Sequence, residues 1–222
     1  MSPVNESDTR ERLLDAAEKL FAETGIGATS LRAVTAEAQA NLASVHYHFG
    51  SKESLLLEVF GRRIKPVNHE RLERLDKAMT DAPDDLDAIV RSFVAPALLV
   101  LADPEMDGHH VSKLMGRFFS EPAEIKMQIF PLFDEVAERF TQALKQHLPH
   151  LSPTELFWRF HYMVGCMAFS LIESESLESR AGSLELGHIE DNIEGMVRFI
   201  SGGLSAPSLQ TPAVAKEADG EA

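Results

Sequence analysis

Apolar side chains recur at helical spacing along nearly the whole chain. In the first segment Leu13, Ala17, Leu20 and Phe21 share one helical face, because they stand at positions i, i+4, i+7 and i+8. Gly25 follows directly and provides a stop for that helix. The pattern contains neither the alternation typical of a β-strand nor an internal repeat. The sequence therefore predicts an all-α protein of about nine helices.

Capping residues, glycines and prolines mark where these helices begin and end. The predicted helices cover residues 9–24, 31–38, 42–48, 85–101, 110–120, 122–147, 153–172 and 188–201. Between the third and the next of these, a further helix begins after the Ser51 cap, and the chain is helical again beyond Pro66 until the loop at 81–84. Pro66 either kinks the fourth helix or splits it in two, and Pro131 interrupts the seventh. We expect a loop over residues 173–187. The polar tail 204–222, rich in Pro, Ala and Ser, is expected to be disordered.

The second and third predicted helices are short and only three residues apart, with a longer helix before them. This is the layout of a helix-turn-helix, whose second short helix enters the major groove of double-stranded DNA. Short capped helices also occur in helical domains that do not bind DNA, so spacing alone leaves both interpretations open. The residues placed to contact bases or phosphates are Thr29, Ser30, Arg32, Leu42, Ala43, Ser44, His46, Tyr47, His48 and Lys52.

The charge of the chain is unevenly distributed. The formal net charge is −14, which at first argues against DNA binding. Residues 1–77 hold 11 basic and 12 acidic residues, a net charge of −1, whereas residues 78–222 hold 10 and 23, a net charge of −13. Phosphate contact needs a local basic face and not a basic total. Only the first third of the chain offers such a face, and the acidic remainder would point it toward DNA.

Residues 9–65 resemble the N-terminal DNA-binding domain of the tetracycline-repressor (TetR) family. The resemblance is carried by residues 13–17, 20–25, 28–32, 36–38 and above all 47–55, Tyr-His-Phe-Gly-Ser-Lys-Glu-Ser-Leu. It implies that Leu42, Ala43 and Ser44 read the major groove, and that Tyr47, His48 and Lys52 hold phosphates. Gln39 and Ala40 replace the usual Gly-Val, Asn41 replaces the usual Ser, and His46 stands where Tyr is common. These departures leave the operator sequence open.

Membership of that family implies a repressor with a second, C-terminal domain for ligand binding and dimerisation. We assign residues 66–203 to this domain. In the family the last two long helices form the interface of a homodimer, and the apolar stripe predicted to do so comprises Leu156, Phe160, Val164, Met167, Ala168 and Leu171. An ordinary buried helix would show the same stripe.

Aromatic and methionine side chains gather in the C-terminal part, which holds ten of the 13 phenylalanines. Such residues could wall an apolar pocket for a small-molecule inducer, although most residues of this kind are simply core. The expected ligand contacts are Phe93, Met115, Arg117, Phe118, Phe119, Met127, Phe133 and Phe157.

The segments 62–68, 70–72 and 115–122 resemble the PsrA-like branch of the family, whose regulators respond to long-chain fatty acids. That resemblance favours a fatty acid or acyl-coenzyme A as inducer, with Arg117 as the cation for its head group. Alternatively, Arg117 pairs with Glu121 one turn further on. A drug-like or aromatic inducer, as in regulators of efflux or detoxification genes, is the competing hypothesis.

Other classes of function find little support. The chain contains no phosphate-binding loop, no His-Glu-x-x-His and no Gly-x-Ser-x-Gly motif, so we expect neither an enzyme nor a cofactor. No metal site is expected, because Pro149 disrupts the one grouping of histidines, at 109, 110, 147 and 150. We expect no membrane association either. The single cysteine, Cys166, fits a core position in a cytoplasmic protein. A helical interaction module without DNA remains the other alternative.

Overall fold

The computed structural model describes residues 6–103 and 108–209. These residues form eleven α-helices, two short 3-10 helices and no strand, so the predicted all-α class is confirmed. The helices are α1 (Glu6–Thr24), α2 (Leu31–Glu37), α3 (Leu42–Phe49), α4 (Lys52–Asp81), α5 (Leu86–Leu99), η1 (Val100–Ala102), α6 (Gly108–Ser120), α7 (Ala123–Ile129), η2 (Phe130–Leu132), α8 (Asp134–His147), α9 (Pro153–Ile172), α10 (Ser174–Ala181) and α11 (Ile189–Ser205).

Two features account for the difference from about nine helices. The predicted seventh helix is two helices, α7 and α8, separated by η2 at Pro131. The loop predicted over residues 173–187 is wrong, because its first part forms α10. This helix buries none of its side chains, so it lacks the apolar periodicity by which a helix is recognised in a sequence.

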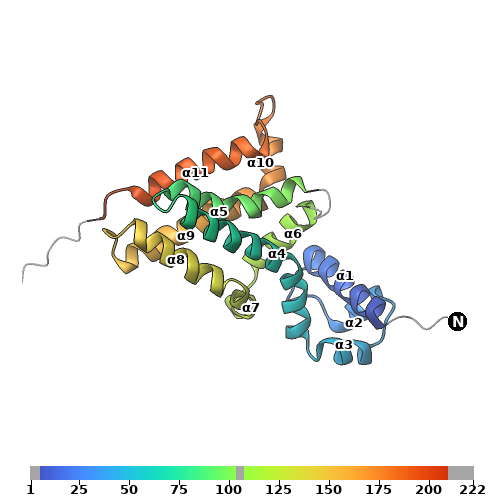
Figure 1. The fold of residues 1–222 in the computed structure, drawn as a ribbon. Helices are drawn as coiled ribbons and strands as arrows, with labels where there is room; N and C mark the ends of the chain where they lie inside the picture. Colours follow the sequence, from blue (N-terminus) through green and yellow to red (C-terminus); the bar gives the residue numbers. More distant parts are fainter. Residues whose placement is uncertain (1–5, 104–107, 210–222) are drawn as a thin grey trace, which may run out of the picture.

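The helices form a small head and a larger body (Figure 1). The head consists of α1, α2, α3 and the first turns of α4, and α1 packs against α2, α3 and α4. In the body, α5 lies at the centre and contacts α4, α8, α9 and α11. The head touches the body again where α1 packs against α6.

Helix α4 belongs to both parts. It is a continuous helix of 30 residues with Pro66 inside it, so the predicted domain boundary between residues 65 and 66 falls within a helix. Figure 1 shows α4 changing direction between its part beside α3 and its part beside α8. A proline inside a helix removes one backbone hydrogen bond and bends the helix. Of the two alternatives for Pro66, the structure favours the kink.

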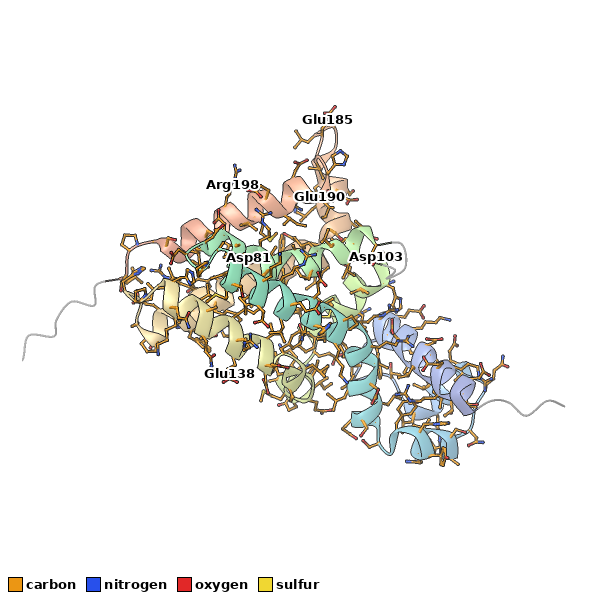
Figure 2. All side chains as sticks on the ribbon, viewed as in Figure 1. Asp81, Asp103, Glu138, Glu185, Glu190 and Arg198 are labelled. Carbon is orange, nitrogen blue, oxygen red and sulfur yellow. The ribbon has the colours of Figure 1, made fainter. Side chains whose placement is uncertain are left out.

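The body carries most of the acidic surface. Figure 2 labels Asp81, Asp103, Glu138, Glu185 and Glu190 on its outer surface, and all five are exposed. This agrees with the charge of −13 on residues 78–222. Of the predicted tail, residues 204 and 205 belong to α11, and residues 210–222 lie outside the part of the chain that the structure describes.

The turn between α2 and α3 requires a left-handed backbone at Gln39, whose φ is 50°. This is one of the two positions where the TetR family usually has Gly-Val. A residue with a Cβ atom in the left-handed region is strained by about 1–2 kcal/mol, whereas glycine adopts it freely. The turn therefore holds α3 in place at the expense of backbone strain.

We predict that Gln39→Gly raises the free energy of unfolding by about 0.5–1 kcal/mol, the relieved strain less the extra chain entropy of glycine. Urea denaturation followed by circular dichroism measures this change. Gln39→Ala is the control and should leave stability unchanged, because alanine also carries a Cβ. Equal stabilisation by both variants would show that backbone strain is not the cause.

Candidate nucleic-acid interface

Helix α3 presents one face to solvent and anchors the other in the head. Asn41 caps its first turn, with Oδ1 accepting from the Ser44 amide at 2.9 Å. Val45 and Phe49 are buried against the head, as their spacing predicts. On the outer face Leu42 is 40% exposed and Tyr47 72% exposed. Ala43 is also exposed and Ser44 is half-buried, so the predicted base-reading residues share the amino end of this helix.

The start of α2 lies near this face but only part of it is available. Ser30 caps α2 through a 3.1 Å bond from the Ala33 amide, and it is exposed together with Arg32. Thr29 is buried, and its hydroxyl donates to the Gly25 carbonyl at 2.7 Å. The Thr29 hydroxyl is therefore engaged within the head, and any phosphate contact at this position would be left to its backbone amide. Its hydroxyl satisfies a carbonyl at the end of α1, where helices leave acceptors without partners.

Two of the predicted phosphate contacts already make bonds within the head. The Nδ1 atom of His46 donates to the Gly50 carbonyl at 3.0 Å, which leaves Nε2 directed elsewhere. The ammonium of Lys52 donates to the Ile26 carbonyl at 3.0 Å and ties the start of α4 to the turn after α1. His48 is half-buried, with its ring 5.0 Å from that of Tyr47.

A buried carboxylate joins the head to the body. Glu18 of α1 is 2% exposed, and its oxygens lie 2.7 Å from Arg62 Nη2 and 2.7 Å from Arg63 Nη2, both on α4. His110 of α6 approaches the same carboxylate at 3.2 Å. Arg62 also bonds to Asp15 at 2.8 Å, and these carboxylates raise the pKa of Arg62 although partial burial opposes the shift. One buried anion thus holds three helices together.

A second link runs between α6 and the turn after α1. Arg117 donates from Nε to the Ala22 carbonyl at 3.1 Å and from Nη2 to the Glu23 carbonyl at 3.0 Å. Glu121 accepts from the Ile26 amide at 2.7 Å. Arg117 therefore caps α1, and both its predicted roles, as a ligand cation and as a partner of Glu121, are corrected. The sequence shows that the side chain is cationic but not which free helix end it reaches.

The predicted dimer stripe on α9 is also corrected. Leu156, Phe160, Met167, Ala168 and Leu171 are buried within the single chain, and Val164 is half-buried. Helix α9 is apolar on nearly every side, so a sequence pattern cannot show which side faces the body and which faces outward. The stripe that we expected to meet a second chain packs against this chain's own core.

The opposite side of α9 is exposed and aromatic. Trp158, Tyr162 and Phe169 lie at helical spacing and are 53%, 63% and 58% exposed. Phe157, expected to contact a ligand, lies on this outer surface as well. On the neighbouring helix α11, Phe199 is 71% exposed. A Cβ atom added at Gly165 or Gly195 would meet nothing within 4 Å.

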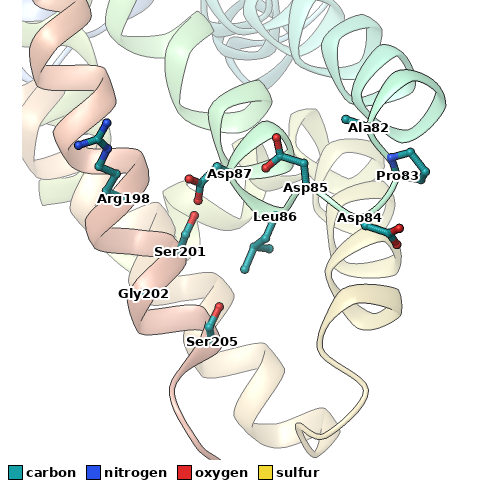
Figure 3. Close-up of a pocket in the computed structure, with 10 residues that line it drawn as sticks. All are labelled: Ala82, Pro83, Asp84, Asp85, Leu86, Asp87, Arg198, Ser201, Gly202 and Ser205. Atoms are coloured by element: carbon teal, nitrogen blue, oxygen red, sulfur yellow. The ribbon is translucent and has the colours of Figure 1, made fainter.

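The remaining predicted ligand residues fall into two groups. Phe93, Met115 and Phe118 are buried in the body, where the Phe93 ring packs 5.0 Å from that of Phe140. Phe119 and Met127 are exposed, and Phe133 is half-buried, around α6, α7 and η2. Hollows in the described surface lie at the α5–α11 edge (Figure 3) and beside α1, and none of the predicted ligand residues lines either one.

Arg71 is a buried cation that the sequence reasoning missed. Its guanidinium donates to the Phe93 carbonyl at 2.8 Å, to Asn68 Oδ1 at 3.1 Å and to Met167 Sδ at 3.0 Å, and lies 4.3 Å from the centre of the Phe93 ring. Burial lowers the pKa of Arg71 to about 10. The described residues place no carboxylate in an ion pair with it. The helical spacing of Arg71 from buried Ile64 and Leu75 could have signalled this, because a charged residue at an inward-facing position of a helix is rare.

The described residues contain no group of three or more histidine, cysteine or acidic side chains that could hold a metal ion. None of the described helices combines the length and hydropathy that crossing a lipid bilayer requires.

Two segments of the sequence match family models of known regulators. Residues 13–59 match the model described as bacterial regulatory proteins, tetR family, and residues 91–203 match a tetracyclin repressor-like C-terminal domain. The second match alone spans more than half of the chain.

Individual relatives agree with these models. The chain is 30% identical to an HTH-type transcriptional repressor of Mycobacterium tuberculosis over 135 residues, which are 60% of this chain and 64% of that protein. It is 32% identical to an HTH-type nicotine-responsive transcriptional repressor of Paenarthrobacter nicotinovorans over 82 residues, 37% of this chain and 40% of that protein. The chain thus spans less than two thirds of the length of either relative.

The fold is similar to that of solved regulators. The transcriptional regulator FadR of Bacillus subtilis, solved in complex with stearoyl-CoA, superposes with a TM-score of 0.65 at 11% identity, covering 87% of this chain and 98% of that one. At this identity the likeness concerns the arrangement of the helices alone.

Proposed function

The chain belongs to the TetR family, and on that premise we propose that it is a homodimeric transcriptional repressor that binds a palindromic DNA operator. An apolar ligand with an acidic head group would bind the body and release the protein from the operator. The observation that best supports DNA binding is the exposed face of α3. Leu42, Ala43 and Tyr47 are exposed on this face, and Val45 and Phe49 anchor the helix in the head. Such a helix fits the major groove.

DNA binding is tested by salt-dependent gel shift on the DNA upstream of the gene. We predict that Lys52→Ala and Arg32→Ala each weaken binding about tenfold and lower the slope of log affinity against log salt by about 1, because each removes one phosphate contact. Ser44→Ala should change the preferred sequence and not the slope.

Lys77→Ala is the matched control, since it removes one exposed cation from the end of α4 far from the head. The exposed Arg32 side chain makes no hydrogen bond or ion pair within the described part of the chain, so its variant separates DNA contact from stability. An unchanged affinity and slope for Arg32→Ala and Lys52→Ala would refute the assignment.

The dimer interface follows from the exposed side of α9 and α11. Large aromatic side chains rarely stay exposed together on a monomer, and glycines without neighbours allow a second chain to approach closely. We assign Trp158, Tyr162 and Phe169 of α9 and Phe199 of α11 to an interface between two copies of the chain. Two α9–α11 pairs would then form a four-helix bundle.

We predict that Tyr162→Glu converts the dimer to a monomer at micromolar concentration, because it would bury an unpaired carboxylate in the interface. Light scattering measures the mass. Met127→Glu is the control, as an equally exposed apolar residue of α7 outside the proposed interface. A dimeric Tyr162→Glu, or a monomeric wild-type chain, would contradict the assignment.

Arg71 supports an acidic ligand. A buried charge without a counter-ion is unfavourable by several kcal/mol, and here the surroundings supply only neutral acceptors and an aromatic ring. Only three of its five N–H groups have acceptors among the described residues. A carboxylate or phosphate arriving with an apolar tail would complete the ion pair, and the tail would lie among Phe93 and its aromatic neighbours.

Asn68 connects Arg71 to η2, near the surface. This side chain accepts from Arg71 and donates from Nδ2 to the Leu132 carbonyl of η2 at 2.7 Å. Beside η2 the apolar side chains Phe119, Met127 and Phe130 are 42%, 64% and 42% exposed, and the Phe130 ring lies 5.8 Å from that of buried Phe118. We propose that a ligand enters between α7, η2 and α4. The stearoyl-CoA bound to FadR supports an acyl ligand.

We predict that oleate or oleoyl-coenzyme A releases the wild-type protein from DNA, and that Arg71→Met raises the concentration needed at least tenfold because the head group loses its cation. Arg74→Met is the control, since Arg74 lies one turn away on α4, is part-exposed and pairs with Glu70. Both variants are first checked for unchanged DNA affinity and melting temperature.

The competing function, a regulator responsive to a drug-like or aromatic ligand, is favoured by the nicotine-responsive relative. Nicotine and a cationic dye are therefore included in the same titration. Release by either of them without release by the lipids would overturn the acidic-ligand proposal and favour this alternative.

A further inference from the structure

A groove lies at the end of the body far from the head, between α5 and α11 (Figure 3). It has a volume of about 730 Å³. The loop after α4 and the first turn of α5 form one wall, and the last two turns of α11 form the other. This groove shares no residue with the DNA-facing surface, with Arg71 or with the aromatic side of α9.

The wall from α5 is acidic. Asp84, Asp85 and Asp87 all line the groove. Asp85 caps α5, with one oxygen accepting from the Ala88 amide at 3.1 Å. Among the described residues no cation pairs with Asp84 or Asp87, because Arg198, the cation in the groove, is bonded to Glu194 at 3.0 Å.

The wall from α11 contains a hydroxyl without a partner. Ser201 is 8% exposed, and its Oγ atom makes no hydrogen bond although the atom itself is buried. A buried hydroxyl without a partner is unfavourable, and such groups are uncommon in folded proteins. Figure 3 shows this hydroxyl pointing from α11 toward the Asp87 carboxylate on α5. The pair is arranged to receive a donor that the chain does not supply.

The loop that carries the acidic wall is fixed in place. The Asp85 amide donates to the Ala82 carbonyl at 3.0 Å, and the imidazole of His147 on α8 bonds to the Pro83 carbonyl. The groove is therefore held by α4, α5, α8 and α11 together.

We propose that this groove binds an aliphatic polyamine. One protonated amine would donate to the Asp87 carboxylate and the Ser201 hydroxyl, a methylene chain would lie over Leu86, and a second amine would reach Asp84 or Asp85. A polyamine fits better than a metal ion, because the carboxylates do not converge on one point that a metal could occupy. An anion is disfavoured by the three aspartates.

Isothermal titration calorimetry on the full chain tests the proposal at physiological salt. Spermidine and 1,4-diaminobutane should each bind once per chain, and 1-aminobutane should bind at least tenfold more weakly than the diamine because it has one charge. Asp87→Asn should weaken diamine binding at least tenfold. Ser201→Ala should weaken it severalfold without lowering the melting temperature, since the hydroxyl it removes has no partner.

Asp134→Asn is the matched control, because it makes the same change of charge in the first turn of α8 and should leave binding unchanged. If Asp87→Asn and Asp134→Asn weakened diamine binding equally, the binding would depend only on the overall charge of the chain, and the proposed site would be wrong. Absence of binding to the wild-type chain would overturn it as well, as would calcium binding that depends on Asp87 in the same way. None of these outcomes bears on DNA binding or on Arg71.

Discussion

The ion pairs of Glu18 fix how the head sits on the body. Its carboxylate is withdrawn from water and is held only because Arg62 and Arg63 of α4 and His110 of α6 surround it. Removing one partner from a buried ion pair leaves an uncompensated charge, which is unfavourable by about 3–5 kcal/mol. Three helices therefore keep one relative arrangement, and the exposed face of α3 has a defined direction with respect to α9 and α11.

The head could be read from the sequence because its signals are local. Ser30, Asn41 and Ser51 cap α2, α3 and α4 as predicted, and each cap acts within three residues of its own position. The inward positions of α3 follow from helical spacing alone. Where a side chain turns toward a distant carbonyl, as Lys52 does toward Ile26, its orientation lies beyond what a local pattern can show.

The body was less predictable because its functional features depend on which helices meet. Helix α9 is apolar on nearly every side, so the side with Phe160 and the side with Tyr162 cannot be told apart from the sequence until α5 and α11 are placed. Arginine adds a second difficulty, since its long side chain can reach in several directions. Arg117 reaches the end of α1 while Arg71 is enclosed beside Phe93, and the sequence does not show which partner each side chain reaches.

Arg71, the proposed partner of the ligand's acidic group, lies on α4, whose first turns belong to the head. This helix therefore connects the ligand site physically to the head. Arg71 follows Arg63 by eight residues on α4, which is about 12 Å along the helix axis. Pro66 lies between them, where a lost backbone bond makes the helix easier to bend. A ligand that pairs with Arg71 would also disturb its bond to Asn68, and with it the tie from Asn68 to η2. The ligand can shift the head only if it binds one conformation of α4 better than another, because equal affinity for both conformations would leave their populations unchanged. The bonds of Arg71 to α4, α5 and α9 are the contacts in which that difference would have to arise.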